Sequence, residues 1–327
     1  MEVVLVSTYD MGRQPFGLAS PAAWLRGAGH GVHCVDLTRT RLPEDTVKGA
    51  ALVAFFLPMH TATRLALAVM DRVGALNPAA HLCAYGLYAP LNADILREHG
   101  AQTILGPEFE PSLVDLANTL GSRPVGPTFR SGVLESARAY GSIGRVAFIT
   151  PDRSDLPPLT KYASLQVGGD RKVVGYTEAT RGCKHRCRHC PIVPVYDGRF
   201  RAVPIDIVMA DVRAQVAAGA QHITFGDPDF FNGPTHALAI VEGLARELPG
   251  VSYDVTIKVE HLRQYGTALP RLRDTGCAFV TSAVESFDDV VLDKLEKGHT
   301  HADFVEVVRQ CQSIACLLYT SPSPRDS

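Results

Sequence analysis

The sequence predicts an α/β protein built from two successive parallel sheets, the first doubly wound and the second an open, partial barrel. Short apolar runs without polar alternation recur along the chain, which is typical of strands covered on both faces. Amphipathic stretches of helical length separate these runs, and strands that alternate with helices form parallel sheets through right-handed crossovers. A chain of 327 residues has room for about two such domains.

The first domain is predicted to span residues 1–120. Five strands separated by helices indicate a doubly wound, flavodoxin-like sheet. The expected strands are 2–7, 31–37, 51–57, 81–86 and 102–105, and the expected helices are 20–28, 61–76, 91–99 and 110–120. Ligands of such sheets bind beyond the carboxyl ends of the strands, although ordinary loop chemistry explains the Gly, Pro and ring side chains there equally well. The candidate ligand residues in these loops are Tyr9, Gly12, His60, Gly86 and Glu108.

Residues 121–172 are predicted to be a linker between the domains. The segment is rich in Gly, Pro, Ser and Arg, and prolines at this density block helices and favour extended paths. A short strand is expected at 146–149.

The second domain is predicted to span residues 173–313, as the first four strand–helix units of a partial barrel. Its expected strands are 173–177, 222–225, 252–259 and 278–284, and its expected helices are 205–218, 235–248, 269–275 and 302–311. Chemistry in such barrels takes place at the carboxyl ends of the strands. Polar residues gather at these ends: a cysteine-rich loop, Asp227 and Asp229, Lys258 and Glu260, and Glu285.

Three of the eight cysteines, Cys183, Cys187 and Cys190, lie in a C-x3-C-x2-C loop that follows the first strand of this domain. Thiolates are soft ligands, so the loop predicts either zinc or an iron–sulfur cluster. Zinc in a structural site is usually bound by four ligands, so His185 or His189 would have to be the fourth. A cluster held by three thiolates leaves one iron open for another molecule.

Composition and residue pattern argue against a nucleic-acid-binding, membrane-spanning or secreted protein. A hydrophobic content of 46% and a charged content of 20% are ordinary for a globular protein, and a net charge of −2 gives no reason to expect nucleic acid as a partner. No apolar run reaches the length of a membrane span, and the first residues predict a strand rather than a signal peptide. The remaining cysteines do not form a disulfide pattern, so we expect a reducing, cytoplasmic location.

The cysteine spacing, with the ring-bearing His189 before the last cysteine, resembles the radical S-adenosylmethionine (SAM) superfamily. The resemblance implies that a 4Fe–4S cluster on the three cysteines reductively cleaves SAM to a 5′-deoxyadenosyl radical. It also implies a reductant such as flavodoxin or ferredoxin, and a small-molecule or peptide substrate of unknown identity. The SAM-binding residues that it implies are His189, Gly226, Asp227, Asp229, Lys258 and Glu285.

The doubly wound domain resembles that of cobalamin-binding radical SAM enzymes, so cobalamin is a candidate cofactor. The Asp-x-His-x-x-Gly motif that supplies a histidine to cobalt is absent, because Asp10-Met11-Gly12 lacks the histidine. Segments 14–25, 57–65, 85–92 and 226–234 resemble one group of these proteins, named for a Cys-Cys/selenocysteine-Ala-Glu-Pro tail. A non-catalytic zinc- or ligand-binding regulator is the alternative function.

The tail of that group, and barrel strands five and six, have no counterpart in the sequence. Residues 314–327 show neither helical nor strand periodicity, so we predict a non-native, disordered tail. The fourth strand of the barrel would then have an unpaired edge. We expect the full-length parent to be the enzyme, and this truncated chain to bind a cluster but turn over poorly.

Overall fold

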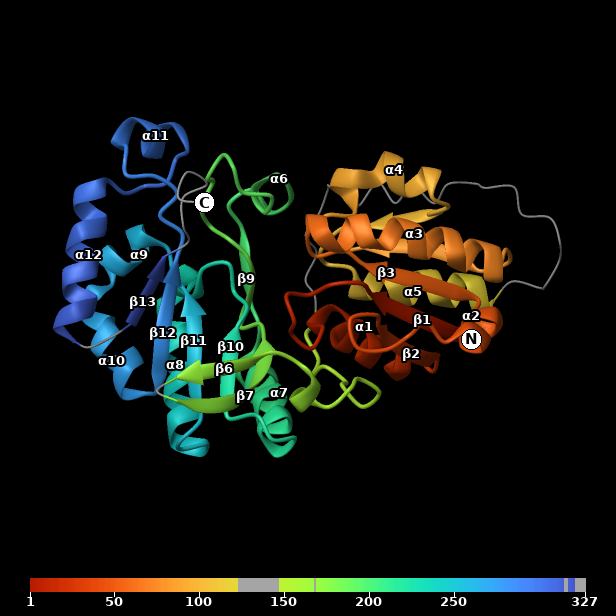
Figure 1. Ribbon diagram of the computed structural model, residues 1–327, viewed down its shortest axis with the longest axis horizontal. Helices are drawn as coiled ribbons and strands as arrows, with labels where there is room; N and C mark the ends of the chain where they lie inside the picture. Colours follow the sequence, from red (N-terminus) through yellow and green to blue (C-terminus); the bar gives the residue numbers. More distant parts are fainter. Residues whose placement is uncertain (123–146, 168, 315–316, 321–327) are drawn as a thin grey trace. The chain divides into compact units, whose positions relative to one another are not determined.

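The protein is described here by a computed structural model that covers residues 1–122, 147–167, 169–314 and 317–320. The chain divides into two compact units, Met1–Lys161 (unit 1) and Tyr162–Ser327 (unit 2). The division falls inside the segment 121–172, and each unit has its own main sheet (Figure 1). Among the described residues, no helix combines the length and the apolar character needed to cross a membrane.

Unit 1 contains a five-stranded parallel sheet in the order β2-β1-β3-β4-β5. This is the strand order of a flavodoxin-like, doubly wound sheet, so the predicted fold of the first domain is confirmed. The strands are β1 (Glu2–Ser7), β2 (Gly31–Asp36), β3 (Leu52–Phe56), β4 (His81–Tyr85) and β5 (Thr103–Leu105).

Helices cover both faces of this sheet because side chains of successive strand residues point to opposite sides. Val3 and Leu5 of β1 belong to one core cluster, and Val4 and Val6 belong to another. The helices α1 (Phe16–Gly27) and α5 (Glu110–Gly121) pack on the first cluster, and α2 (Glu44–Gly49), α3 (His60–Leu76) and α4 (Ala93–Glu98) pack on the second. Burial on both faces explains why the strands lack polar alternation.

Helix α1 begins at Phe16 and not at the expected residue 20, although Pro21 lies inside it. Proline has no N–H, so the carbonyl of Gly17, four residues earlier, loses its helical donor. The hydroxyl of Tyr85 donates a hydrogen bond to this carbonyl at 2.8 Å. The hydroxyl of Tyr85 therefore replaces the missing N–H donor, and α1 continues through Pro21.

The described residues of the segment 121–172 belong to the two units and do not form a separate linker. Residues 147–149 form no strand, so the strand expected there is wrong for these residues, while residue 146 lies outside the described part. Asp152 and Asp155 pair with Arg26 of α1 at 2.6 and 3.0 Å. Residues 147–161 therefore belong to unit 1, and the residues from 162 onward begin unit 2.

Unit 2 contains a six-stranded sheet in the order β13-β12-β11-β10-β7-β6 (Figure 1). All neighbours are parallel except the hairpin of β6 with β7. The strands are β6 (Ser164–Val167), β7 (Asp170–Thr177), β10 (His222–Phe225), β11 (Ser252–Thr256), β12 (Cys277–Ser282) and β13 (Leu317–Thr320). The four strands expected in this domain correspond to β7, β10, β11 and β12, which confirms the partial-barrel pattern.

The four helices expected in unit 2 are present near their predicted positions. They are α7 (Ile205–Ala217), α8 (Pro234–Glu247), α10 (Leu269–Asp274) and α12 (His301–Ser313). Three short helices were not expected: α6 (Val193–Tyr196), α9 (Val259–Gln264) and α11 (Asp289–Lys294). Helices of four to six residues are too short to show a 3.6-residue period, so the sequence gives little sign of them.

The prediction of a disordered tail is wrong for residues 317–320. Leu317–Thr320 form β13, which pairs in parallel with Phe279–Ser282 of β12. An edge strand offers a row of unpaired backbone groups, and the segment Leu-Leu-Tyr-Thr has the composition that suits pairing with such an edge. The edge of β12 is therefore covered. Residues 315–316 and 321–327 lie outside the described part.

Candidate functional site

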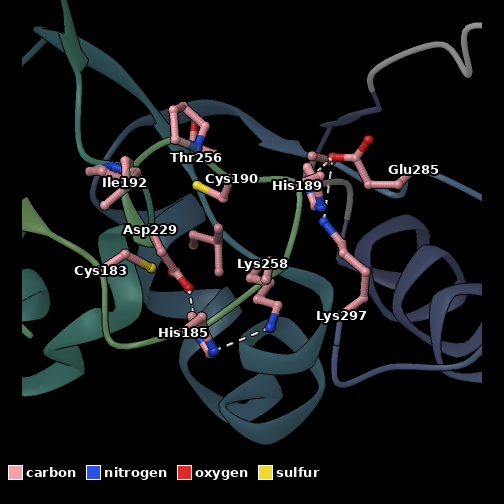
Figure 2. A pocket seen from close by; sticks show the side chains of 15 residues that line it. Cys183, His185, His189, Cys190, Ile192, Asp229, Thr256, Lys258, Glu285 and Lys297 are labelled. Carbon is pink, nitrogen blue, oxygen red and sulfur yellow. Dashed lines mark hydrogen bonds and ion pairs between the residues drawn. The ribbon is translucent and has the colours of Figure 1, made fainter. Parts of the chain in front are cut away.

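A cavity of about 310 Å³ lies in unit 2 at the carboxyl ends of its parallel strands. The cysteine loop forms one wall, and residues that end or follow β10, β11 and β12 form the rest (Figure 2). Cys183, Cys187 and Cys190 all line this one cavity. In Figure 2, the sulfur atoms of Cys183 and Cys190 point toward the same space. The structure therefore brings the three predicted metal ligands together.

The cysteine loop is closed at its base by a short antiparallel pair, β8 (Thr180–Gly182) with β9 (Phe200–Ala202). Within the loop, the backbone N–H of Cys190 donates to the carbonyl of Cys187 at 3.1 Å. Helix α6 follows directly. The loop thus has a defined backbone conformation in which the thiols converge.

Asn232 holds the start of the cysteine loop. Its amide oxygen accepts a hydrogen bond from the backbone N–H of Lys184 at 3.1 Å, and its amide nitrogen lies 3.4 Å from the carbonyl of Gly182. The same oxygen lies 3.7 Å from the sulfur of Cys183. The sequence analysis did not single out Asn232, although it lies in the quoted segment 226–234.

The far part of the loop is tied to the segment after α11. The backbone N–H of Arg188 donates to the carbonyl of Leu295 at 3.1 Å, and the Arg188 guanidinium pairs with Glu296 at 2.6 Å. Two chain segments that are distant in the sequence therefore restrain the loop. Both restraints are independent of any bound group.

Burial has a clear effect on the thiols of the loop. It raises the pKa of the Cys183 thiol to about 11 and also raises the pKa of Cys190. Neutral thiols are poor ligands, while a bound metal centre favours the thiolate. Metal binding at this loop must therefore release protons.

Lys258 lies on another wall of the cavity, directly before α9, and Glu260 lies beside it in the first turn of that helix. The ammonium of Lys258 pairs with Glu260 at 2.9 Å and donates to the Nδ1 atom of His185 at 3.1 Å. The side chain of Lys258 is only 9% exposed. A buried cation that borders the cavity suits the recognition of an anionic group, as the sequence analysis proposed for this residue.

His189, Glu285 and Lys297 form a second polar group in the cavity (Figure 2). One oxygen of Glu285 lies 3.1 Å from Nε2 of His189 and 3.5 Å from the ammonium of Lys297. Glu285 has a φ of +70°, a left-handed conformation that is uncommon for this residue type and that is often stored at functional sites. His189 and Glu285 were predicted from the sequence, but Lys297 was not; its nearest signal is its place beside Gly298, shortly after α11.

Gly226 and Asp227 do not belong to the residues that line the cavity. The carboxylate of Asp227 accepts hydrogen bonds from the hydroxyl of Thr180 at 2.5 Å and from the backbone N–H of Ala179 at 3.0 Å. A side chain at Gly226 would collide with the ring of Tyr176. Both residues thus have structural roles next to the site, and Asp229, two residues further on, borders the cavity instead.

The stability of unit 2 should depend on pH through Asp227. Burial raises the pKa of this carboxyl to about 7, with the nearby Glu178 acting in the same direction and the hydrogen bonds from Thr180 and Ala179 opposing it. Because the folded-state pKa lies above the usual value, the contribution is fully present below about pH 4 and is lost as the pH rises through about 7. The loss should be on the order of 4 kcal/mol, at about 1.4 kcal/mol per pKa unit.

This loss can be measured by urea unfolding of the wild type and of Asp227→Asn between pH 4 and pH 8. The asparagine cannot ionise, so the difference in unfolding free energy should shift in favour of the variant as the pH rises. A difference that stays constant over this range would contradict the assignment.

The candidate ligand residues of unit 1 also share one edge of their sheet. Tyr9 and Gly12 follow β1, His60 begins α3 after β3, Gly86 follows β4 and Glu108 follows β5. Because these strands are parallel, their carboxyl ends lie at the same edge. The structure therefore places the five residues where a doubly wound sheet binds ligands.

Comparison with known proteins shows which family unit 2 resembles. The model of the radical SAM superfamily matches residues 177–316, which include the three cysteines and every residue that lines the cavity. Residues 177–316 form a radical SAM domain. A 4Fe–4S cluster and SAM are the cofactors typical of radical SAM proteins.

Curated relatives match about half of this chain at low identity. A tRNA-2-methylthio-N(6)-dimethylallyladenosine synthase of Chlorobium luteolum is 26% identical over 166 residues, which are 47% of this chain and 36% of the relative. The ribosomal protein uS12 methylthiotransferase RimO of Desulfosudis oleivorans is 26% identical, over 47% of this chain and 37% of its own. The chain thus spans little more than a third of the length of these relatives.

Two solved structures match both units. The radical SAM methyltransferase TsrM of Kitasatospora setae, with cobalamin and a 4Fe–4S cluster bound, has a TM-score of 0.71 at 17% identity and covers 98% of this chain and 66% of its own. The cobalamin-dependent radical SAM enzyme OxsB, with aqua-cobalamin and SAM bound, has a TM-score of 0.77 at 15% identity, over 98% and 48% of the chains. At these identities the similarity establishes the radical SAM fold with its preceding doubly wound sheet.

Proposed function

We propose that this radical SAM protein binds a 4Fe–4S cluster through Cys183, Cys187 and Cys190 and binds SAM in the adjoining cavity. The observation that carries the proposal is the convergence of three thiols on one cavity, which other polar residues also border. Three thiolates suit a cluster that keeps one iron open, and the donor set is soft, as iron–sulfur chemistry requires. When bound and given one electron, the cluster supplies reductive cleavage of SAM to methionine and a 5′-deoxyadenosyl radical.

The residues of the chain would bind and orient SAM around the cluster. Lys258 presents a cation suited to the SAM carboxylate. Glu285 uses one oxygen for His189 and Lys297, which leaves the other free to accept hydrogen bonds from the ribose hydroxyls. The apolar side chains between these groups, among them Ile192 and Ile257, would limit the access of water to the bound SAM.

A structural zinc site is the competing function, and the geometry of His185 speaks against it. A zinc site would need a fourth ligand from His185 or His189. The Nδ1 and Nε2 atoms of His185 lie 3.1 Å from Lys258 and 3.1 Å from Asp229, so neither nitrogen is free for a metal beside the thiols. His189 lies against Glu285.

Anaerobic reconstitution with iron and sulfide tests the proposal. We expect about four iron atoms and matching sulfide per chain, saturable binding of SAM, and formation of 5′-deoxyadenosine after addition of dithionite. SAM binding and iron content report on this chain even where turnover is slow. One zinc per chain, with no iron taken up, would overturn the proposal in favour of a zinc-binding regulator.

The proposal extends to the group within the radical SAM superfamily and to the class of substrate. We assign the chain to the group with the Cys-Cys/selenocysteine-Ala-Glu-Pro tail because the four quoted segments lie at the start of α1 and after β3, β4 and β10, at carboxyl edges of both sheets. The substrate would be a small molecule or a peptide. The reaction itself would be carried out by the whole protein.

Cobalamin is the candidate ligand of unit 1, because TsrM and OxsB bind it and have the same arrangement of domains. The residues that would receive it are those at the carboxyl edge of the sheet. The loop around Asp10 has no histidine, so it would supply no imidazole ligand to the cobalt. A cobalt assay after incubation with hydroxocobalamin tests this: cobalt near one atom per chain supports binding, and none contradicts it.

We further propose a small redox protein, a flavodoxin or ferredoxin, as the electron donor, and no nucleic-acid partner. Three arginines in or beside the cysteine loop pair with carboxylates: Arg181 with Glu178, Arg186 with Asp197, and Arg188 with Glu296. Paired cations are less available for phosphates. The seven cysteines in the described residues are free thiols, which suits a reducing, cytoplasmic location.

A further inference from the structure

Three side chains from different parts of the chain, two of them buried and one largely so, meet at the cysteine loop. His185 lies in the loop between Cys183 and Cys187, Asp229 follows β10, and His261 lies in α9. One oxygen of Asp229 lies 3.1 Å from Nε2 of His185 and 2.7 Å from Nδ1 of His261. The side chains of Asp229 and His261 are 2% and 1% exposed. The contacts therefore form in a place that water hardly reaches, where hydrogen bonds to a charged group are strong.

The hydrogen-bond roles in this group follow from Lys258. Its ammonium can only donate, and it lies 3.1 Å from Nδ1 of His185, closer than the Glu260 carboxylate oxygen at 3.4 Å, so we assign this nitrogen as the acceptor. Nε2 of His185 then carries the proton and donates to Asp229, as Nδ1 of His261 also does. The second oxygen of Asp229 accepts from the backbone N–H of Phe231 at 3.0 Å. Both carboxylate oxygens are thus in use.

In this arrangement Asp229 binds two histidines and a backbone N–H rather than SAM. Its two oxygens already accept three hydrogen bonds, and two of the donors are histidines. A divalent cation held by two histidines and one carboxylate is the other reading of the same atoms, since they lie within 4.8 Å of one another. The adjacent ammonium of Lys258 repels such a cation, and it accounts for the tautomer of His185 without one.

We propose that Asp229 and His261 are positioning residues for the cluster, which act by holding His185 and so fix the loop between Cys183 and Cys187. This inference rests on the proposed function. His185 is the only side chain of that three-residue stretch to line the cavity, so a contact to it restrains the whole stretch. Groups that orient metal ligands in this indirect way typically change metal retention by about 10- to 100-fold when they are removed.

The test uses two substitutions at one position and a matched control. His261→Leu removes the donor, while His261→Asn keeps an N–H close to the place of Nδ1. The control is His222→Leu: His222 is equally buried, in β10, and its Nε2 lies 2.8 Å from Asp254, but neither residue lines the cavity. The control therefore removes a buried histidine–aspartate contact from the same unit without touching the cysteine loop.

The readout is the rate at which an iron chelator removes iron from each reconstituted chain, with urea unfolding measured in parallel. We expect His261→Leu to lose iron about 10- to 100-fold faster than wild type, His261→Asn to be largely rescued, and His222→Leu to be destabilised but to lose iron at the wild-type rate. Alkylation of the thiols in the cluster-free chains gives a second readout: iodoacetamide should modify Cys183 faster in His261→Leu than in His222→Leu.

The outcomes separate the inference from the proposed function. Equal iron loss and equal alkylation in the two leucine variants would overturn the inference alone. An additional divalent ion in wild type that disappears in His261→Leu would also overturn it, in favour of a second metal site. A wild-type chain that takes up no iron would overturn the proposed function and the inference together.

Discussion

Replacing Cys187 by alanine is expected to prevent this chain from assembling its cluster. A cluster on three cysteines has no spare protein ligand, so the loss of one thiolate leaves two, and the remaining irons are open to solvent and chelators. Iron content should fall from about four atoms per chain to below about one. The brown colour of the reconstituted protein and the binding of SAM that depends on the cluster should disappear with it. Cys183→Ala and Cys190→Ala should behave alike, because all three thiols line the same cavity.

Cys311→Ala is the matched control for these variants. Cys311 is 1% exposed in α12 and does not line the cavity, so its replacement removes a buried thiol without removing a ligand. Urea unfolding of both variants separates a loss of folding from a loss of ligation. Four iron atoms retained in Cys187→Ala, or iron lost to the same extent in Cys311→Ala, would be incompatible with ligation by the loop.

The elements that the sequence predicted well are those whose residues repeat a local pattern. Apolar runs such as that in β1, Val3 to Val6, are buried on both faces of a parallel sheet, and their positions follow from burial alone. Helix α1 was predicted to begin too late because Pro21 suggests a helix start. Its true start depends on Tyr85, a residue far away in the sequence that satisfies the carbonyl left open by the proline.

The candidate site shows the same division between local and distant information. The cysteines were predictable because their spacing lies within eight residues. Asp227 and Asp229 looked equivalent, since both follow one strand, but Asp227 turns toward Thr180 while Asp229 lies under the cysteine loop. The partners that decide this are 47 and 44 residues away, so no local pattern could separate the two carboxylates.

The strand β13 was missed for a related reason. Its four residues have little pattern of their own, and the feature that orders them is the open edge of β12. Pairing with an edge depends on backbone groups, which every sequence carries. A prediction from side-chain periodicity therefore cannot detect it.

Replacing Gly182 by alanine should give the second large effect, on stability and on the cluster together. Gly182 has a φ of +78° directly before Cys183. A Cβ atom there would lie 2.4 Å from the ring of Tyr196 and 2.5 Å from the backbone carbonyl of Arg199, which cannot move without opening the pair β8–β9. The left-handed conformation costs about 1–2 kcal/mol for a residue with a side chain, and overpacking adds about 1–3 kcal/mol. We expect a loss of about 3 kcal/mol in urea unfolding.

Gly219→Ala distinguishes the two contributions. Gly219 has a φ of +98°, but a Cβ atom there would meet no atom within 4 Å. This variant should therefore lose only the conformational part, about 1–2 kcal/mol, and should retain iron like wild type. Gly182→Ala should lose more stability and should bind less iron, because the backbone that must shift leads directly into Cys183. Equal destabilisation of the two variants, with full iron in both, would mean that the close approach at Gly182 does not shape the cysteine loop.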